Sequence, residues 1–341
     1  MSDPHRLPMA PDPNGQACRL EDKVAWLRGN LGPGDELIET HFAYVLLAGE
    51  RAWKLRRPVR RDPMDYATLE ARRLGAESDV RLNRRLAPGV YLGVRPLTRA
   101  DDGFAIGGDG PVVDWLVEML RLDRSRTLDV MLAQGRVAPG DLQRVAAMLA
   151  GFYAREPSAV ADGAALVERL TRQVAANHRV LDTIDTARAA RLRDAQLALL
   201  ADRREWFDDR AARGCVIEAH GDLRPEHVVL TEPPVVIDCL EFDRSLRVLD
   251  RAEELEYFVL DAERIGQGDA GRAVARQCLS LLGDAPPAGL PQFYRSHRAA
   301  TRAKLYAWRA DEPDDGGSTA WLEAAGRYLG LALEAATRAL T

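Results

Sequence analysis

Short apolar runs bounded by turn residues fill the first third of the chain. Four strands are predicted there, at 43–48, 51–55, 90–97 and 111–122. The first two flank Gly49-Glu50 and therefore predict a β-hairpin closed by a two-residue turn. A loop rich in Asp and Gly (101–110) separates the last two. A long charged helix is predicted over 66–86.

From Thr127 onward the apolar spacing is helical, with one interruption at 215–243. Strands grouped ahead of helices, rather than alternating with them, indicate the α+β class. We expect two lobes: a small antiparallel N-terminal sheet plus one helix over 20–122, and a larger, mainly helical C-terminal lobe over 123–341. Residues 119–127 are the expected linker, and a cleft between lobes is a preferred place for a ligand.

The composition is that of a soluble globular protein, with 46% of the 341 residues hydrophobic and 29% charged. A net charge of −5 gives no reason to expect a nucleic-acid partner, and no apolar run reaches the roughly 18 residues that a membrane span needs. Residues 1–19 lack the apolar segment of a secretory signal and are predicted to be a disordered tail. The four cysteines form no CxxC pair, which argues against a zinc site or a disulfide framework and favours a reducing cytoplasm.

The interruption reads CVIEAHGDLRPEHVVLTEPPVVIDCLEFD. Its two β-branched runs, VVL and VVI, flank a Pro-containing loop and predict a second hairpin. The simplest register places His227 opposite Asp238, with Cβ atoms about 5 Å apart, and Asp222 lies on the loop that leads into the hairpin, close after His220. Phosphoryl transfer uses such a cluster, because one carboxylate accepts the hydroxyl proton and another holds the metal ions. An Asp at a strand end can also be a plain turn residue.

HGDLRPEHVVL and VVIDCLEFD resemble the catalytic and metal-binding segments of aminoglycoside phosphotransferase-like kinases. The usual form in that family is HGDxxxxN, followed by a strand and a metal-binding Asp. The resemblance implies that Asp222 is the catalytic base, that His220 belongs to the same catalytic motif, and that Asp238 is a metal ligand. It also matches Asp250 to a buried Asp that braces the catalytic loop, with a simple helix N-cap as the alternative.

The N-terminal third resembles the phosphotransferase-like domain of longer bacterial proteins that also carry a P-loop ATP-binding domain. The segments that carry this likeness are ETHFAYVLLAGERAWKLRRPV, LEARRLGAESDVRLNRRLAPGVYLGVRPL and DWLVEMLRL, and it covers about 36–310. The sequence contains no GxxxxGK[ST] loop, so we do not expect the second domain here. The resemblance implies that the N-terminal lobe binds ATP, with Mg²⁺ or Mn²⁺ as the metal.

Lys54 matches the strand lysine that contacts the α- and β-phosphates, although an exposed strand lysine is the alternative. Glu77 is matched to the helix glutamate that holds this lysine, and Glu70 is the second candidate on the same helix face. Either could instead pair with an Arg one turn away. The remaining expected nucleotide-binding residues are Thr40 and His41 on the phosphate-covering turn, and Met119 and Leu122 near the linker.

His227 stands where the family has a metal-binding Asn. Imidazole can ligate a metal, but Mg²⁺ prefers oxygen, so a nucleotide-binding pseudokinase with a regulatory or scaffold role is the alternative function. His227 could also do no more than hydrogen-bond the catalytic loop. A protein Ser/Thr kinase is the last candidate, because no glycine lies between Glu36 and Ala48 and no APE-like segment follows Asp238.

These features together predict an ATP-dependent phosphotransferase that moves the γ-phosphoryl group to a hydroxyl of a small molecule. The helix predicted over 290–310 carries Arg295, Arg298 and Arg302 on one stripe, at i, i+3 and i+7. This stripe could line the pocket of an anionic acceptor, but a solvated basic face is the simpler interpretation. The sequence identifies neither the acceptor nor the oligomeric state.

Overall fold

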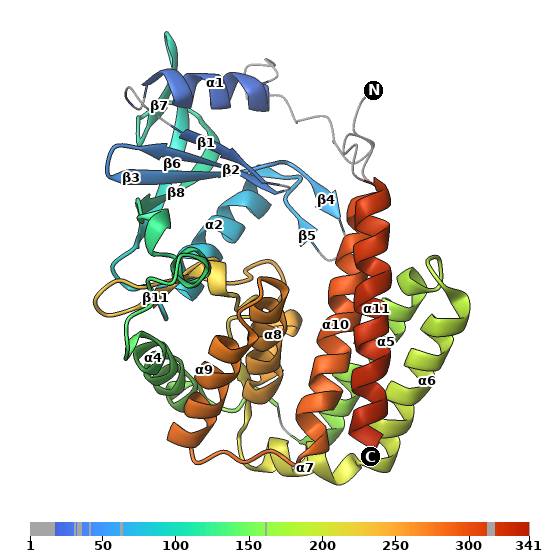
Figure 1. The fold of residues 1–341 in the computed structure, drawn as a ribbon. Helices are drawn as coiled ribbons and strands as arrows, with labels where there is room; N and C mark the ends of the chain where they lie inside the picture. Colours follow the sequence, from blue (N-terminus) through green and yellow to red (C-terminus); the bar gives the residue numbers. More distant parts are fainter. Residues whose placement is uncertain are drawn as a thin grey trace. The chain divides into compact units, whose positions relative to one another are not determined.

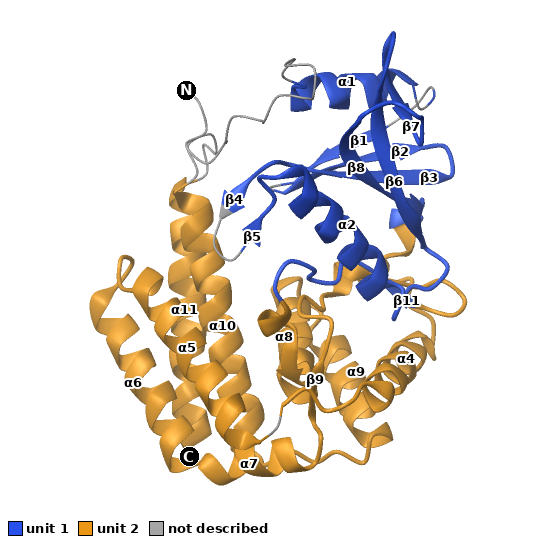
Figure 2. Cartoon of the chain, turned by 180° about the vertical axis from the view of Figure 1, so that it is seen from behind, with its two compact units in different colours: residues 1–124, 235–243 blue, residues 125–234, 244–341 orange. Residues whose placement is uncertain are grey.

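The computed structural model describes residues 18–30, 32, 36–40, 42–61, 64–160, 162–311 and 318–340. The predicted tail over 1–19 lies outside them except for Cys18 and Arg19, and Cys18 is buried against Leu20 and Leu27. The chain forms two compact units (Figure 2). The first contains the residues up to Arg124 and also Val235–Asp243, and the second contains Ser125–Pro234 and the residues from Arg244 onward.

The first unit is built on an antiparallel six-stranded sheet with the order β1-β2-β3-β8-β6-β7 (Figure 1). Its strands are β1 (Glu36–Glu39), β2 (Ala43–Ala48), β3 (Arg51–Arg56), β6 (Tyr91–Ala100), β7 (Gly103–Ile106) and β8 (Val112–Leu120). Arg60–Arg61 (β4) and Met64–Asp65 (β5) form a separate short ladder. The predicted β2–β3 hairpin is confirmed, and Gly49 turns it at a φ of 52°, where a residue with a side chain would be strained. The prediction of a loop over 101–110 is wrong in part, because β7 lies inside this range and pairs with β6.

Two helices cover opposite faces of this sheet. Helix α1 (Leu20–Asn30) packs with Leu116 of β8, whereas α2 (Leu69–Asn83) packs with the next residue, Val117. Successive strand residues point to opposite faces, so the two helices lie on different sides. Helix α2 is shorter than predicted because Thr68 caps it, its side chain accepting a hydrogen bond from the Ala71 amide.

The second unit is mainly helical, as the sequence predicts. Its helices are α3 (Leu128–Ala133), α4 (Asp141–Arg155), α5 (Gly163–Leu181), α6 (Thr186–Asp202), α7 (Arg204–Ala212), α8 (Arg251–Arg264), α9 (Gly268–Leu281), α10 (Gly289–Ala310) and α11 (Ser318–Leu340). Strand β9 (Val216–Glu218) pairs with β12 (Val248–Asp250), which leads directly into α8. Within the part of the chain that the structure describes, no helix is both long and apolar enough to cross a membrane.

The residues of the second predicted hairpin form strands β10 (Val228–Val229) and β11 (Val235–Val236). The border between the two units falls between these strands. Asp222 and His227 therefore belong to the second unit and Asp238 to the first, so the proximity of His227 to Asp238 stays a prediction.

Candidate active site

Lys54 lies between two carboxylates of the first unit. Strand β3 places it opposite Val45 and Val117, on the face of the sheet that α2 covers. Its Nζ is 3.0 Å from Oδ2 of Asp79 and 3.2 Å from Oδ1 of Asp238. Burial by itself lowers the pKa of Lys54, but Asp79, Asp238 and Glu241 outweigh it and hold that pKa well above its usual value. Lys54 is therefore a largely buried, protonated cation.

Asp79, and not Glu77, is the helix carboxylate that holds Lys54. Glu77 and Glu70 both bond Arg73 on the exposed side of α2. The predicted Lys54–Glu77 pair is wrong because two residues turn a helix by about 200°, so that position 77 faces away when position 79 faces the sheet. The alternative, an Arg partner one turn away, is the arrangement observed. The sequence does contain a signal for Asp79, because this carboxylate falls on the same helix stripe as the buried Ala76 and Val80.

A second buried cation shares Asp79. Arg56 donates a hydrogen bond of 2.7 Å to Oδ2 of Asp79 and another of 2.8 Å to Oε1 of Glu241. Asn83 donates to the other oxygen of Asp79 at 2.7 Å, and the Tyr66 hydroxyl donates to Glu241 at 3.0 Å. Neither Arg56 nor Glu241 was among the residues predicted for the site. This network fixes the position of Asp79 and, through it, of Lys54.

The backbone at Asp238 is strained. Asp238 is the only non-glycine among the described residues with a positive φ, at 61°. Its amide donates to the Tyr91 hydroxyl, and the amide of Cys239 donates to Asn83, so strand β6 and helix α2 both hold the segment. The Asp238 side chain is 55% exposed. Strain of this kind persists where neighbouring contacts over-determine it, often at functional sites, and an accessible carboxylate oxygen suits a hard divalent cation.

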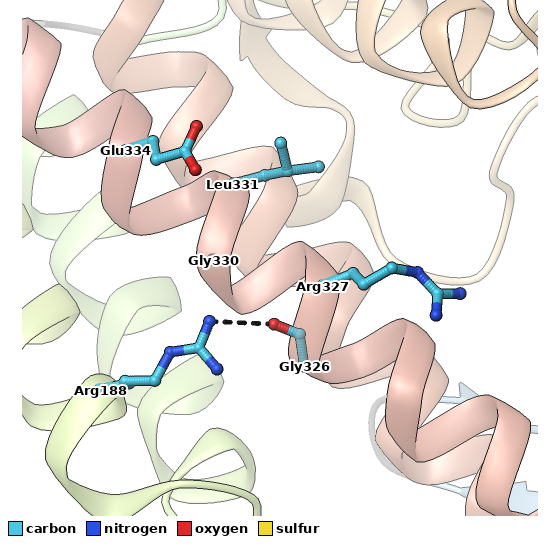
Figure 3. A pocket seen from close by; sticks show the side chains of 6 residues that line it. All are labelled: Arg188, Gly326, Arg327, Gly330, Leu331 and Glu334. Atoms are coloured by element: carbon cyan, nitrogen blue, oxygen red, sulfur yellow. Dashed lines mark hydrogen bonds between the residues drawn. The ribbon is translucent and has the colours of Figure 1, made fainter.

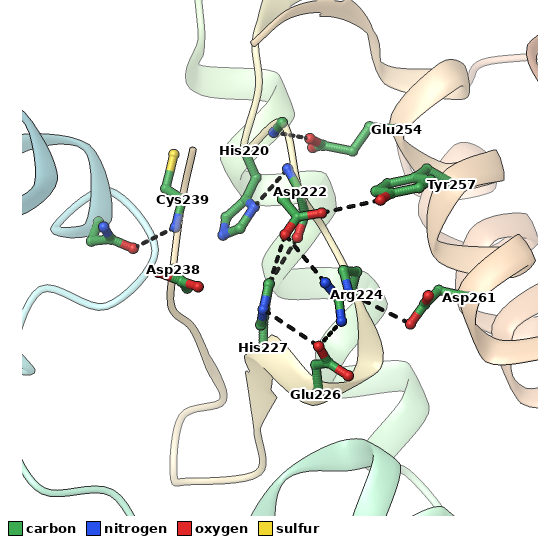
Figure 4. Close-up of polar contacts among 12 residues, drawn as sticks. His220, Asp222, Arg224, Glu226, His227, Asp238, Cys239, Glu254, Tyr257 and Asp261 are labelled. Atoms are coloured by element: carbon green, nitrogen blue, oxygen red, sulfur yellow. Dashed lines mark hydrogen bonds and ion pairs between the residues drawn. The ribbon is translucent and has the colours of Figure 1, made fainter. Parts of the chain in front are cut away.

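The segment from His220 to His227 forms a compact polar loop in the second unit (Figure 4). Glu254 of α8 accepts a 2.6 Å hydrogen bond from the Gly221 amide, and Tyr153 donates to the other Glu254 oxygen at 2.8 Å. His220 is fully buried, and its Nδ1 lies 3.3 Å from the Asp222 amide, which donates to it. The loop is thus fixed by side chains from α4 and α8.

Asp250 is the N-cap of α8. This is the alternative to the role that the resemblance implied, a buried Asp that braces the catalytic loop. Its side chain accepts from the Ala252 amide and also bonds Arg210, at 2.7 Å to each oxygen, and Tyr294 at 2.9 Å. The brace is instead Glu254, one helical turn further on. Glu254, Tyr257 and Asp261 occur at i, i+3 and i+7, which puts them on one stripe of α8. That spacing is the sequence signal from which Glu254 could have been predicted as the brace.

Asp222 is 28% exposed and is bonded by its neighbours. The Tyr257 hydroxyl donates to Oδ1 at 3.2 Å, and Arg224 lies 3.6 Å from Oδ2. His227 places Nδ1 2.8 Å from the Asp222 carbonyl oxygen. A carbonyl only accepts, so Nδ1 carries the proton and, in the neutral ring, the lone pair is on Nε2. His227 does hydrogen-bond the loop, and a metal-ligand role for Nε2 stays a prediction.

The arginine stripe of α10 is not a solvated face at Arg298 and Arg302. Both are 7% exposed, and they pair with Glu253 at 3.0 Å and with Asp261 at 2.6 Å. Arg295 pairs with Glu263. The predicted solvated basic face is wrong here because α8 presents carboxylates opposite the stripe.

The other expected nucleotide-binding residues lie in the first unit. The Thr40 hydroxyl bonds both the amide and the carbonyl of Ala43 and so closes the β1–β2 turn. His41 lies outside the described residues. Met119 is buried on β8, and Leu122 is partly buried beside it. Their contacts with a nucleotide stay predictions.

No group of three or more His, Cys, Asp or Glu side chains among the residues described is arranged to hold a metal ion. A groove of about 530 Å³ lies between α6 and α11 (Figure 3), but none of the predicted site residues lines it. Its lining residues are Arg188, Gly326, Arg327, Gly330, Leu331 and Glu334.

No family model matches the chain. Two uncharacterized mycobacterial proteins, Rv2004c of Mycobacterium tuberculosis (strain H37Rv) and Mb2027c of Mycobacterium bovis, are each 31% identical to it over 280 residues. The match covers 80% of this chain and 55% of each relative. The chain therefore spans about half the length of the curated relatives it matches.

Solved structures of several kinases and phosphotransferases resemble the fold. Choline kinase from Cryptosporidium parvum Iowa II has a TM-score of 0.54 and 11% identity, covering 93% of this chain and 95% of that one. The GDP complex of a point mutant of aminoglycoside 2'-phosphotransferase-IIIa has a TM-score of 0.52 and 15% identity, covering 91% and 96%. A thermostable mutant of aminoglycoside phosphotransferase APH(4)-Ia has a TM-score of 0.50 and 12% identity, covering 91% and 98%. The chain thus has the protein-kinase-like α+β fold that aminoglycoside phosphotransferases and choline kinases share.

Proposed function

We propose that the chain is an ATP-dependent phosphotransferase that moves the γ-phosphoryl group of ATP to a hydroxyl of a small molecule. The observation that carries this proposal is the largely buried, protonated Lys54, held by Asp79 beside the strained and accessible Asp238. A fixed cation next to an exposed carboxylate is the pair that phosphate and metal binding require. The solved structures with this fold include a phosphotransferase in complex with GDP and a choline kinase.

The surroundings of each residue support the role that we propose for it. Lys54 would bind the α- and β-phosphates, and Asp238 would contribute a carboxylate oxygen to the metal. Asp222 takes the proton of the acceptor hydroxyl, whose oxygen bonds to phosphorus as the bond to ADP breaks. His227 would offer Nε2 to the metal, since its Nδ1 is occupied by the loop carbonyl. Bound ATP with Mg²⁺ would supply the transferable phosphoryl group and the charge that neutralises it.

The second candidate is a nucleotide-binding pseudokinase with a regulatory or scaffold role. His227 favours it, because a nitrogen stands where hard Mg²⁺ prefers oxygen and because that ring already serves the loop.

Binding and turnover separate the two functions. The purified chain would be titrated with ATP and Mg²⁺ by calorimetry, and ADP release would be followed with a pool of hydroxylated metabolites. We expect Asp222→Asn to bind ATP as the wild type does but to release ADP about 10²–10⁴-fold more slowly. Asp269→Asn, a fully exposed site on α9, is the matched control and should change neither. ATP binding without turnover in the wild type would favour the pseudokinase, and no ATP binding would refute both.

A further inference from the structure

Tyr257 of α8 lies directly against the carboxylate that we assign as the catalytic base. Its hydroxyl donates to Oδ1 of Asp222 at 3.2 Å, and the residue is only 4% exposed. Burial raises the pKa of Tyr257 well above its usual value, and Asp222 and Asp261 raise it further. The phenol therefore keeps its proton at physiological pH and acts as a hydrogen-bond donor.

The ring of Tyr257 is itself fixed by two arginines of α10. The guanidinium carbons of Arg298 and Arg302 lie 5.2 and 5.0 Å from the ring centroid, within the range of cation–π attraction. Each guanidinium is anchored in turn on a buried carboxylate of α8, Arg298 on Glu253 and Arg302 on Asp261.

The two oxygens of Asp222 consequently have different surroundings. Oδ1 accepts a hydrogen bond from the phenol, whereas Oδ2 lies 3.6 Å from Arg224 and 3.9 Å from Nδ1 of His227. The hydrogen bond from the buried hydroxyl fixes the rotation of the carboxylate and stabilises negative charge on Oδ1, which makes Oδ1 the weaker proton acceptor.

We propose that Tyr257 is a positioning residue for the phosphoryl transfer: with Arg298 and Arg302 it fixes the Asp222 carboxylate so that Oδ2 takes the acceptor proton. This rests on the proposed function of Asp222. Tyr257 acts through Asp222 and touches neither nucleotide nor acceptor in this scheme. A base misplaced by a fraction of an ångström transfers the proton less well, while ATP binding at Lys54 is unaffected.

A double-mutant cycle tests the proposal. Tyr257→Phe removes the hydroxyl and keeps the ring between its arginine contacts. With ATP and Mg²⁺ as the probe and phosphate release to water as the readout, we expect kcat to fall about 10-fold and the KM for ATP to stay within about twofold of wild type. In an Asp222→Asn background the same substitution should have no further effect. Tyr294→Phe, which removes a buried hydroxyl bonded to Asp250 at 2.9 Å, is the matched control and should keep the wild-type rate.

A wild-type rate in Tyr257→Phe, or an equal loss in the Asp222→Asn background, would overturn the proposal. If wild type and Asp222→Asn release phosphate equally, the proposed function of Asp222 fails instead. The carboxyl carbon resonance of Asp222, assigned by its loss in Asp222→Asn, then decides the question without activity. We expect Tyr257→Phe to shift or broaden that resonance, and an unchanged resonance would refute the positioning role.

Discussion

Replacing Asp79 by Asn removes the charge on which two cations converge. Asp79 is fully buried, and donor nitrogens of Lys54, Arg56 and Asn83 lie within 3.0 Å of its carboxylate oxygens. Burial raises the pKa of the Asp79 carboxyl, and Lys54 and Arg56 oppose that rise. With three donors so close, we take the carboxylate to be ionised at neutral pH. Asparagine keeps the shape but turns an amide towards the cations.

The loss of stability follows from what is left behind. Removing one partner of a buried ion pair costs about 3–5 kcal/mol. Here Glu241 still lies 2.8 Å from Arg56, and Asp238 still lies 3.2 Å from Lys54, so each cation keeps one carboxylate. We therefore expect Asp79→Asn to lower the free energy of unfolding of the first unit by about 3 kcal/mol, near the lower end of that range.

Urea denaturation monitored by tryptophan fluorescence measures this change, and calorimetry measures ATP binding of the same variant. Lys54 should drift towards Asp238 when Asp79 is neutral, so we expect ATP to bind at least about 10-fold more weakly, which corresponds to about 1.4 kcal/mol. Glu77→Gln is the matched control. Its side chain is 47% exposed and, among the described residues, bonds only Arg73, so stability and ATP binding should stay at wild-type values.

Wild-type stability and ATP affinity in Asp79→Asn would refute this reasoning, because they would mean that Asp79 is protonated or does not hold Lys54. An effect of Glu77→Gln larger than that of Asp79→Asn would restore Glu77 as the partner of Lys54.

Three further predictions concern the metal and the pH dependence of stability. Asp238→Asn should abolish the Mg²⁺ dependence of ATP binding in calorimetry while the protein stays folded, because Asn also tolerates a left-handed backbone; unchanged Mg²⁺ dependence would put the metal elsewhere. His227→Asn should raise the ratio of Mg²⁺- to Mn²⁺-supported turnover, since an oxygen ligand suits the harder ion, and an unaltered ratio would leave His227 with its loop contact alone. Burial raises the pKa of Glu256 from 4.5 to about 7, so the folded state binds this proton more tightly than the unfolded state. Protonated Glu256 contributes its full stabilisation below pH 4.5, and this contribution to the free energy of unfolding is lost as the pH rises through 7. Glu256→Gln should therefore be about 1–3 kcal/mol more stable than wild type at about pH 8 and equal to it at about pH 4 in urea titrations, and equal stability at both pH values would contradict the shift.

Local features of the fold could be predicted from the sequence. The position of Gly49 between two apolar runs was enough to predict the β2–β3 hairpin. The grouping of strands ahead of helices was enough to predict the α+β class. Strand β7 was missed because Gly103–Ile106 is short and follows Asp-rich turn residues. Its strand conformation comes from pairing with β6, which local composition does not reveal.

The residues that position the site were harder to predict, because each acts through a contact far along the chain. Asp79 meets Lys54 across the helix–sheet interface, and Glu241 reaches Arg56 from 185 residues away. Helical periodicity limits which side of α2 or α8 is buried, but it does not say which polar residue there meets which partner. Glu77 was predicted, with Glu70 as the second candidate, by analogy with a glutamate, although of the three carboxylates only Asp79 falls on the buried stripe.

The most direct test of the central claim is transfer of radiolabel from the γ-phosphate of ATP to an organic acceptor. The purified chain would be incubated with Mg²⁺, γ-labelled ATP and a small-molecule extract, and labelled products would be separated from ATP and free phosphate. We predict a labelled phosphate ester that wild type and Asp269→Asn form and that Lys54→Met and Asp222→Asn do not. Equal labelling by wild type and Asp222→Asn, or labelling by none of them although wild type binds ATP, would contradict the proposed phosphotransferase activity.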